Sequence, residues 1–401
     1  MVYHDSTEIY LDNAATTQAA PDVIEAMMPY LRGDYANPGS AYGFGQVIKN
    51  NLAKARTEVA RIFNCYDSQV IFTSGGSESN NMVFHGLKNH LKEANKKHIL
   101  ISAVEHDSVL NAALSLEKEG FTVELIPVTK AGIISLSDFK DMLREDTGLV
   151  SVMYVNNETG SVNPVEDVGA ICFRRGILFH TDCVQAAGTY KIDVKKINCD
   201  FASISAHKIH GVKGAGALFV NDLSQLEPMI FGGKNQEFGL RGGTENVPGI
   251  IAMAKACKNC CDVISENLNI VSVFKQAFYN ELVHYLKAYK LEKTVRINGM
   301  PIITPGKVLN LYIEGIDGET LMYTLDREGV FISTGSACHS QVVEPSRVLK
   351  AMGLSDEEAR SSVRISFSDM NTTREISKAA QIIAETIWYL HQYKDIHYKS
   401  C

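Results

Sequence analysis

The chain has 401 residues, of which 45% are hydrophobic and 21% are charged, and its formal net charge is −7. This length and composition exclude a disordered chain and provide enough apolar material for a large domain and a smaller one. Acidic and basic residues are mixed throughout, without a basic stripe or a polybasic cluster. We therefore expect neither direct nucleic-acid binding nor a membrane-surface role.

The beginning of the chain and its cysteines indicate a cytoplasmic protein. Residues Met1–Asp5 include an acid where a secretory signal carries basic residues, and no apolar run reaches the roughly 18 residues of a membrane span. The nine cysteines are an odd number in a large chain. This count is more typical of free thiols than of a disulfide framework.

The first half of the chain alternates short β-rich runs with helical stretches. The runs read as buried strands are Val70–Thr73, Ile99–Ser102, Leu149–Val155, Ile177–Thr181, Phe201–Ile204 and Ala217–Val220. The helical stretches between them include Ser77–Leu91, Ser108–Glu119 and Val165–Arg174. This alternation predicts an α/β fold with a mostly parallel sheet covered by helices on both faces. Ligands of such sheets bind beyond the carboxyl ends of the strands.

The second half of the chain has a different pattern. One long helical segment runs from about Asn246 to Lys290, and it is followed by elements of both kinds: a strand at Val308–Ile313, a helix at Glu319–Arg327, a helix near Val348, a strand at Val363–Phe367 and a helix at Glu375–Leu390. We predict a large domain over residues 21–255 and a smaller α+β domain over 256–401. Residues 1–20 are expected to pack across to the smaller domain.

The segment Ser205–Gly214 carries the most specific local signal. Lys208 follows a predicted strand and lies between small residues, which suits a lysine that forms a Schiff base. Such an amine must be partly desolvated, so that a neutral fraction can attack an aldehyde. The alternative is a solvated basic loop, because two lysines and two histidines lie close together here.

The segment Thr73–Asn80 combines a strand end, a glycine turn and a helix start. Its backbone N–H groups and hydroxyls could bind a phosphate at the positive end of a helix dipole. It lacks the Walker lysine and the GxGxxG spacing, so the nucleotide-binding loops match it poorly. The alternative is an ordinary capped helix N-terminus.

Further polar residues follow predicted strands. Asp182 ends a buried strand, where a carboxylate could keep the pyridine nitrogen of pyridoxal 5′-phosphate (PLP) protonated. Gln185 and Asn157 could donate to the phenolic oxygen, and the ring of His106 could lie flat on a cofactor. Each could be a polar loop residue, but their succession at strand ends predicts a cofactor crevice.

Cys338 is the candidate reactive thiol. It lies among glycine, serine and alanine in Ile332–Ser340, which favours an exposed loop over the alternative of a buried structural cysteine, and His339 could favour the thiolate. Cys257, Cys260 and Cys261 resemble a CxxC pair, but they lie in a helical stretch without a second pair at ligand spacing. We interpret these three as packing or incidental thiols and expect no metal site.

Taken in order, these segments resemble the NifS/IscS-like cysteine desulfurases, which are class V aminotransferase-type PLP enzymes of fold type I. The resemblance covers nearly the whole chain and rests on the segments Tyr10–Thr17, Asn37–Ser40, Ser205–Lys208, Arg241–Asn246 and Ser336–Cys338. It implies a large domain built on a sheet of the seven-stranded type and a homodimer with active sites near the subunit interface. It also implies conversion of L-cysteine to L-alanine. The sulfur would form a persulfide on Cys338 and pass to a protein acceptor in iron–sulfur cluster assembly, tRNA thiolation or DNA sulfur modification.

The resemblance also implies roles for individual residues. The cofactor would be bound by Lys208, by Asp182 at the pyridine nitrogen, by His106 on the ring and by Asn157 and Gln185 at the phenolic side. The phosphate would be bound by Gly76, Ser77, Ser205 and His207, with Thr244 of the partner subunit. Arg364 would bind the substrate carboxylate as a bidentate fork, helped by Asn37 and Asn157.

The sequence departs from the family pattern at two positions. Ser77 stands where the family usually has threonine, and it keeps the hydroxyl. His339 replaces the usual small hydroxyl residue after the cysteine.

Alternative functions are a selenocysteine lyase or another PLP β-lyase that forms no enzyme persulfide, and a non-catalytic sulfur-relay scaffold.

Overall fold

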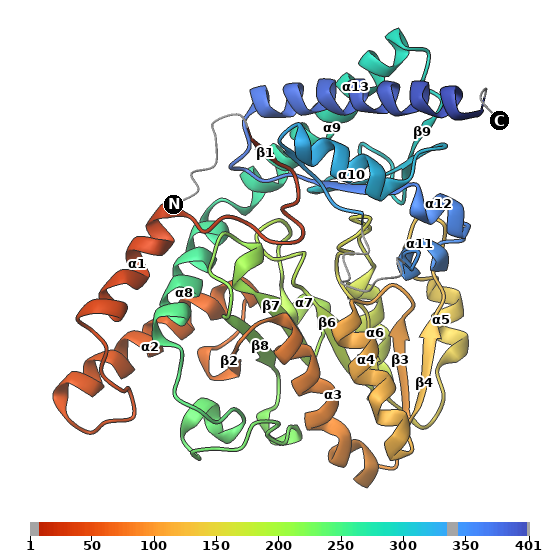
Figure 1. The fold of residues 1–401 in the computed structure, drawn as a ribbon. Coiled ribbons are helices and arrows are strands. Elements are labelled where there is room, and N and C mark those ends of the chain that lie inside the picture. The colour runs from red at the N-terminus through yellow and green to blue at the C-terminus, as the bar shows by residue number, and fades with distance from the viewer. Residues whose placement is uncertain (1–7, 335–343, 399–401) are drawn as a thin grey trace.

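The computed structural model describes residues 8–334 and 344–398. Its centre is a seven-stranded sheet (Figure 1) whose order is β2 (Val70–Thr73), β8 (Gly216–Val220), β7 (Phe201–Ser205), β6 (Leu178–Asp182), β5 (Thr147–Ser151), β3 (His98–Ser102) and β4 (Thr122–Ile126). The strands from β7 to β4 are parallel, and β8 is antiparallel to both of its neighbours. The predicted mostly parallel α/β sheet is therefore confirmed. No helix within the described ranges is long and apolar enough to cross a membrane.

All six predicted strands are present, and two differences concern the sheet. The run predicted to continue to Val155 ends as a strand at Ser151, after which the chain bends toward the turn that contains Asn157. Strand β4 was not predicted. It is an edge strand with mostly partly exposed side chains and so has no continuous buried run.

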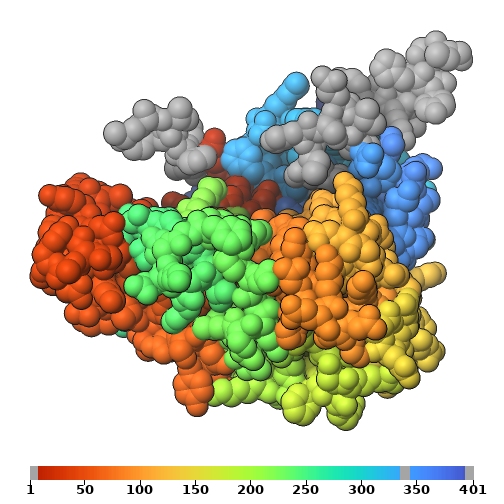
Figure 2. Space-filling view, turned by 90° about the horizontal axis from the view of Figure 1, so that it is seen from below, coloured from red at the N-terminus to blue at the C-terminus, as the bar shows by residue number. Residues whose placement is uncertain are grey.

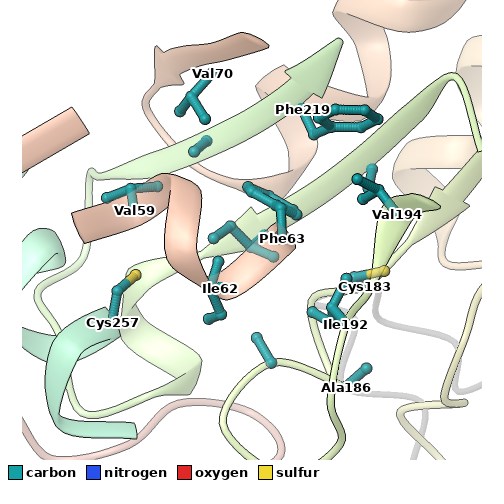
Figure 3. Packing of buried hydrophobic residues seen from close by; sticks show 14 of the residues in the cluster. Val59, Ile62, Phe63, Val70, Cys183, Ala186, Ile192, Val194, Phe219 and Cys257 are labelled. Carbon is teal, nitrogen blue, oxygen red and sulfur yellow. The ribbon is translucent and has the colours of Figure 1, made fainter. Parts of the chain in front are cut away.

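Helices cover both faces of this sheet. One apolar cluster joins the sheet to α2 (Gly43–Phe63), α6 (Val165–Arg175), α7 (Val194–Ile197) and α8 (Val247–Asp262). In Figure 3, Phe63 of α2 faces Phe219 of β8, with ring centroids 6.0 Å apart. A second cluster joins the opposite face to α3 (Gly76–Glu93) and α4 (Asp107–Ser115). Helices α1 (Pro21–Arg32) and α5 (Leu136–Met142) complete this part.

The C-terminal part contains a three-stranded antiparallel sheet, β12 (Ser362–Ser366), β10 (Val308–Ile313) and β9 (Val295–Asn298), with its own apolar cluster. It also contains α9 (Ile264–Ala288), α10 (Gly318–Arg327), α11 (Arg347–Ala351), α12 (Asp356–Arg360) and α13 (Thr373–Tyr398), and it lies at the top of Figure 1. The prediction of a single helical segment from Asn246 to Lys290 is wrong in one respect. The helix breaks at Val263, whose φ of −133° is not helical, and α8 and α9 are separate.

The beginning of the chain connects the two parts. Strand β1 (Ile9–Tyr10) pairs with β11 (Val330–Phe331), and the backbone N–H of Ser366 donates to Leu11 at 2.7 Å. Further along the chain, the backbone N–H of Thr17 donates to the carbonyl of His207, which lies in the turn between β7 and β8. The predicted domain limits stay a prediction, and residue 255 lies within α8, which packs against α1 and α2.

Candidate active site

The candidate site lies at the carboxyl ends of the central strands. Lys208 ends the 3₁₀ turn Ala206–Lys208 directly after β7, and Asp182 is the last residue of β6. His106 is the N-cap of α4, and Gly76 is the first residue of α3. Parallel strands share one carboxyl edge, so these residues, though far apart in the sequence, lie along the same edge of the sheet.

The Lys208 side chain points toward the N-terminal segment. Its Nζ donates to the carbonyls of Ala14 and Ala15 at 2.5 and 2.7 Å. Burial, followed by the positive charges of Arg364 and Lys307, lowers the pKa of Lys208 to about 7. A substantial neutral fraction therefore exists near neutral pH, which is the form that attacks an aldehyde or removes a proton.

A path of hydrogen bonds joins Asp182 to His106. The Nδ2 of Asn80 donates to Asp182 Oδ2 at 2.8 Å and to Ser108 Oγ at 2.9 Å, and Ser108 Oγ lies 2.8 Å from His106 Nδ1. The other oxygen of Asp182 accepts from the N–H of Val184 at 2.9 Å. Asn80 and Ser108 were not predicted as site residues. A signal was present in Asn80, an amide in a helix whose neighbours at that face are apolar.

Close backbone contacts surround the start of α3. An added Cβ would lie 2.5 Å from Gly75 Cα if placed on Gly216, and 2.6 Å from Val184 Cγ2 if placed on Gly76. Gly75 provides no side-chain cap, so the first N–H groups of α3 remain available to an external acceptor. The Ser205 Oγ lies 3.5 Å from the position of a Cβ on Gly75, and Ser77 is exposed. The arrangement suits a small anion.

Arg364 of β12 is almost fully buried next to this crevice. One terminal nitrogen donates to Asp12 Oδ1 at 2.7 Å, the other donates to the carbonyl of Asn157 at 3.1 Å, and Nε is buried without a partner among the described residues. A guanidinium has five N–H donors, so capacity for a further anion remains. Asp12 was not predicted as a site residue, although it lies in the Tyr10–Thr17 segment.

Other predicted residues are near the site but have different contacts from those expected. The Nε2 of Gln185 donates to Ala14 at 2.8 Å, and its Oε1 is buried without a described partner. His207 Nδ1 lies 3.1 Å from Thr16 Oγ1, and burial, together with Lys208 and two other lysines, lowers its pKa to about 4.

Two predicted residues, Asn37 and Thr244, are exposed and have no described hydrogen bond to the other site residues, and a third, Cys338, is not described. Asn37 is exposed between α1 and α2, and its Oδ1 accepts from the N–H of Gly39. Thr244 is exposed in the loop before α8. Cys338, like its neighbour His339, lies outside the described residues.

The described residues on either side of the Cys338 segment are bonded to the site. The N–H of Ser333 donates to the carbonyl of Arg364 at 3.1 Å. On the other side, Ser346 Oγ donates at 2.5 Å to Glu158 Oε2, and burial raises the pKa of Glu158 to about 7. Both ends of this segment are therefore fixed beside Arg364 and the turn of Asn157.

The CxxC-like cysteines lie on α8, and Cys260 lines a small cavity together with Lys208. Cys257 and Cys260 are buried, and Cys261 is partly buried. Burial raises the pKa of the Cys257 thiol, which is typical of an unreactive packing residue. Among the residues that the structure describes, no group of three or more His, Cys, Asp or Glu could hold a metal ion.

Comparison with known families shows to which family the chain belongs. The family model for aminotransferase class V matches residues 9–378. The chain belongs to this family. Among its relatives is the cysteine desulfurase IscS of Methanosarcina thermophila, which is 37% identical over 383 residues, covering 96% of this chain and 93% of the relative.

Solved structures of the family agree with this assignment. A NifS-like protein superimposes with a TM-score of 0.86 at 32% identity, over 95% of this chain and all of that chain. The structure of SspA in complex with cysteine superimposes with a TM-score of 0.75 at 33% identity, over 91% of this chain and all of that chain. The resemblance to the NifS/IscS-like cysteine desulfurases and the predicted fold type are confirmed.

Proposed function

We propose that this family member is a PLP-dependent cysteine desulfurase that converts L-cysteine to L-alanine and leaves the sulfur as a persulfide on Cys338. The observation that carries the proposal is the buried Lys208 amine, with its pKa of about 7, on the strand edge that also holds Asp182. The proposed substrate, cysteine, is supported by the family of the chain, because its similar relatives include cysteine desulfurases.

The residues present fit the cofactor. A phosphate fits the uncapped start of α3, where glycines permit close approach and the hydroxyls of Ser77 and Ser205 are near. The amide nitrogen of Gln185 has a second N–H beyond the one that it donates to Ala14, and Asp182 is oriented by two N–H donors. When bound, PLP supplies an aldehyde that takes the amino group and a ring that accepts the electron pair released at the substrate carbon.

The residues of the chain would do the following work. Arg364 binds the substrate carboxylate and orients the amino acid, and the neutral amine of Lys208 takes the proton from the α-carbon. His106 and Asp182 would help to hold the cofactor, the first through its ring and the second through its negative charge at the pyridine nitrogen. Cys338 attacks the substrate sulfur as a thiolate. An S–S bond forms, the substrate C–S bond breaks, and the electron pair of that bond returns to the carbon, which is protonated to give alanine.

We also propose a homodimer, with Thr244 of the partner subunit completing the phosphate site. Support comes from large apolar side chains that are exposed in two regions. One region runs from α1 through the connecting loop to α2, and the other is the loop before α8; the residues are Ile24, Leu31, Tyr35, Tyr42, Phe44 and Val47 in the first and Ile230, Phe231 and Phe238 in the second. Figure 2 shows these two regions side by side. Exposed apolar surface of this extent is typical of a protein interface. The sulfur acceptor is a protein whose identity follows from none of these features.

Cysteine turnover with the variant Cys338→Ala tests the proposal. The wild-type protein should form alanine, and its alkylated Cys338 peptide should gain the mass of one sulfur after treatment with cysteine. Cys338→Ala should retain the cofactor absorbance at about 400 nm but lose sulfide release. The half-buried Cys261 provides the matched control, because Cys261→Ala should behave as the wild type. Wild-type turnover by Cys338→Ala would exclude the persulfide route and favour a β-lyase.

A further inference from the structure

A second buried lysine lies behind the turn that carries Lys208. Lys307 immediately precedes β10, is 8% exposed, and its backbone carbonyl accepts from the N–H of Phe367 at 2.9 Å. Its Nζ donates to the backbone carbonyl of Lys208 at 3.5 Å. The amine of Lys307 thus contacts the backbone of the turn that carries Lys208.

A small cavity lies beside this contact. It has a volume of about 30 Å³, and the residues around it include Thr17, Lys208, His210, Cys260, Lys307 and Asp369. A space of roughly 10–15 Å³ suffices for a water molecule. Water in this cavity can therefore satisfy the N–H groups of Lys307 that the long contact with Lys208 leaves unmet, which allows the ammonium to stay charged despite its burial.

The charges around the two lysines are unequal. Lys208 is surrounded by Arg364 and Lys307 on the positive side and by Asp12 and Asp182 on the negative side. Asp369 is the acidic residue that acts on Lys307, and Cys260 of α8 is also near. Asp369 is itself paired with His210, at 3.0 Å from Nε2. The negative charge of Asp369 is therefore shared between Lys307 and His210. It leaves part of the positive field of Lys307 acting on Lys208.

We infer that Lys307 is a positioning residue of the active site: it fixes the Lys208 turn from behind, and its charge keeps the Lys208 amine neutral and reactive. The inference rests on the proposed function only for the role of Lys208. Burial lowers the pKa of Lys307 to about 8, so Lys307 is still mostly charged at neutral pH, where Lys208 is losing its proton.

The proton affinity of Lys208 can be measured directly in cofactor-free protein. Brief labelling with acetic anhydride across a pH series, with the Lys208 peptide quantified by mass spectrometry, gives the midpoint at which the amine becomes reactive. The wild-type midpoint should be at about 7. Lys307→Met, which keeps the length of the side chain without its charge, should raise the midpoint by about one unit, a tenfold change in proton affinity.

Matched variants separate the charge from the packing. Lys307→Arg keeps the charge and should leave the midpoint near the wild-type value. Lys213→Met removes an exposed lysine from the same loop and should have no effect. Lys307→Gln also removes the charge but keeps a polar end group, and it should raise the midpoint as Lys307→Met does, which keeps the test available if Lys307→Met fails to fold.

Two results would overturn the inference: an unchanged midpoint in the neutral variants Lys307→Met and Lys307→Gln, or equal shifts in Lys307→Met and Lys307→Arg. Because the labelling uses neither cofactor nor substrate, its outcome is independent of desulfurase activity. Alanine formation with an unmoved midpoint would remove this inference alone. A moved midpoint without alanine formation would instead remove the proposed function.

Discussion

The loop that leads to Thr244 depends on one buried ion pair. Both terminal nitrogens of Arg56 donate to Glu237, at 2.6 and 2.7 Å, and the backbone N–H of Phe72 donates to the same carboxylate at 2.7 Å. The Arg56 guanidinium lies 4.3 Å from the ring centroid of Phe72 and 5.2 Å from that of Phe238. Glu237 and Phe238 have φ values of 40° and 59°, in the left-handed region that residues other than glycine seldom adopt. The ion pair therefore holds a strained loop in place.

The variant Glu237→Gln should destabilise the protein strongly. The side chain of Glu237 is only 3% exposed, and that of Arg56 is 16% exposed. Removing one partner of a buried pair leaves the other charge uncompensated, which costs about 3–5 kcal/mol. An exposed pair, Arg61 with Glu58, offers a control, because Glu58→Gln should cost about 1 kcal/mol or less.

Urea unfolding followed by far-ultraviolet circular dichroism measures these costs. Circular dichroism is preferred to fluorescence because the only tryptophan, Trp388, lies on α13 in the C-terminal part. The double variant Arg56→Met/Glu237→Gln should lose less than the sum of the two single variants, since the uncompensated charge is gone. If Glu237→Gln is no less stable than Glu58→Gln, the ion pair does not hold the loop, and the reasoning from burial is refuted.

Two further predictions concern the site. In cofactor-free protein, the stability of the wild type relative to Lys208→Met should rise by about 1.4 kcal/mol per pH unit above a pH of about 7, because the unfolded lysine, with a pKa of 10.5, still binds a proton that the folded one has lost; parallel stability curves from urea unfolding would contradict the lowered pKa. Arg364→Gln should reduce kcat/KM for cysteine by about 30-fold or more, the equivalent of at least 2 kcal/mol for a truncated buried charge pair. The exposed Arg296 provides its control, because Arg296→Gln should keep the wild-type kcat/KM for alanine formation.

The sequence was most informative where a strand is buried on both faces. Val70–Thr73 was predicted with its observed limits, because a continuous apolar run followed by glycines has few alternative structures. Strand β4 was missed because its edge position leaves Thr122 and Leu125 exposed and removes that run. The break at Val263 was missed as well. Neither glycine nor proline marks it, and the apolar spacing continues on both sides.

Within the site, residues that follow strands were predictable, and their hydrogen-bond partners were not. Lys208 and Asp182 lie at strand ends, where the topology of a parallel sheet alone places them together. Asn80 and Asp12 reach the site from a helix interior and from the N-terminal segment. They are far from Asp182 and Arg364 in the sequence, and tertiary packing brings them together. Local sequence patterns do not reveal such contacts.

In the proposed function, the position of Arg364 would connect substrate binding to the reactivity of Lys208. In the structure, Arg364 is paired with Asp12, and its charge is one of those that lower the pKa of Lys208. A substrate carboxylate bound to Arg364 would add a negative charge there and weaken the field that Arg364 exerts on Lys208. The proton affinity of the Lys208 amine would then be higher in the substrate complex than in the free protein. The described contacts of Lys307 do not include Arg364, so the charge of Lys307 would still favour the neutral form of Lys208. The arginine would therefore respond to the substrate, while the charge of Lys307 would act on Lys208 in both states.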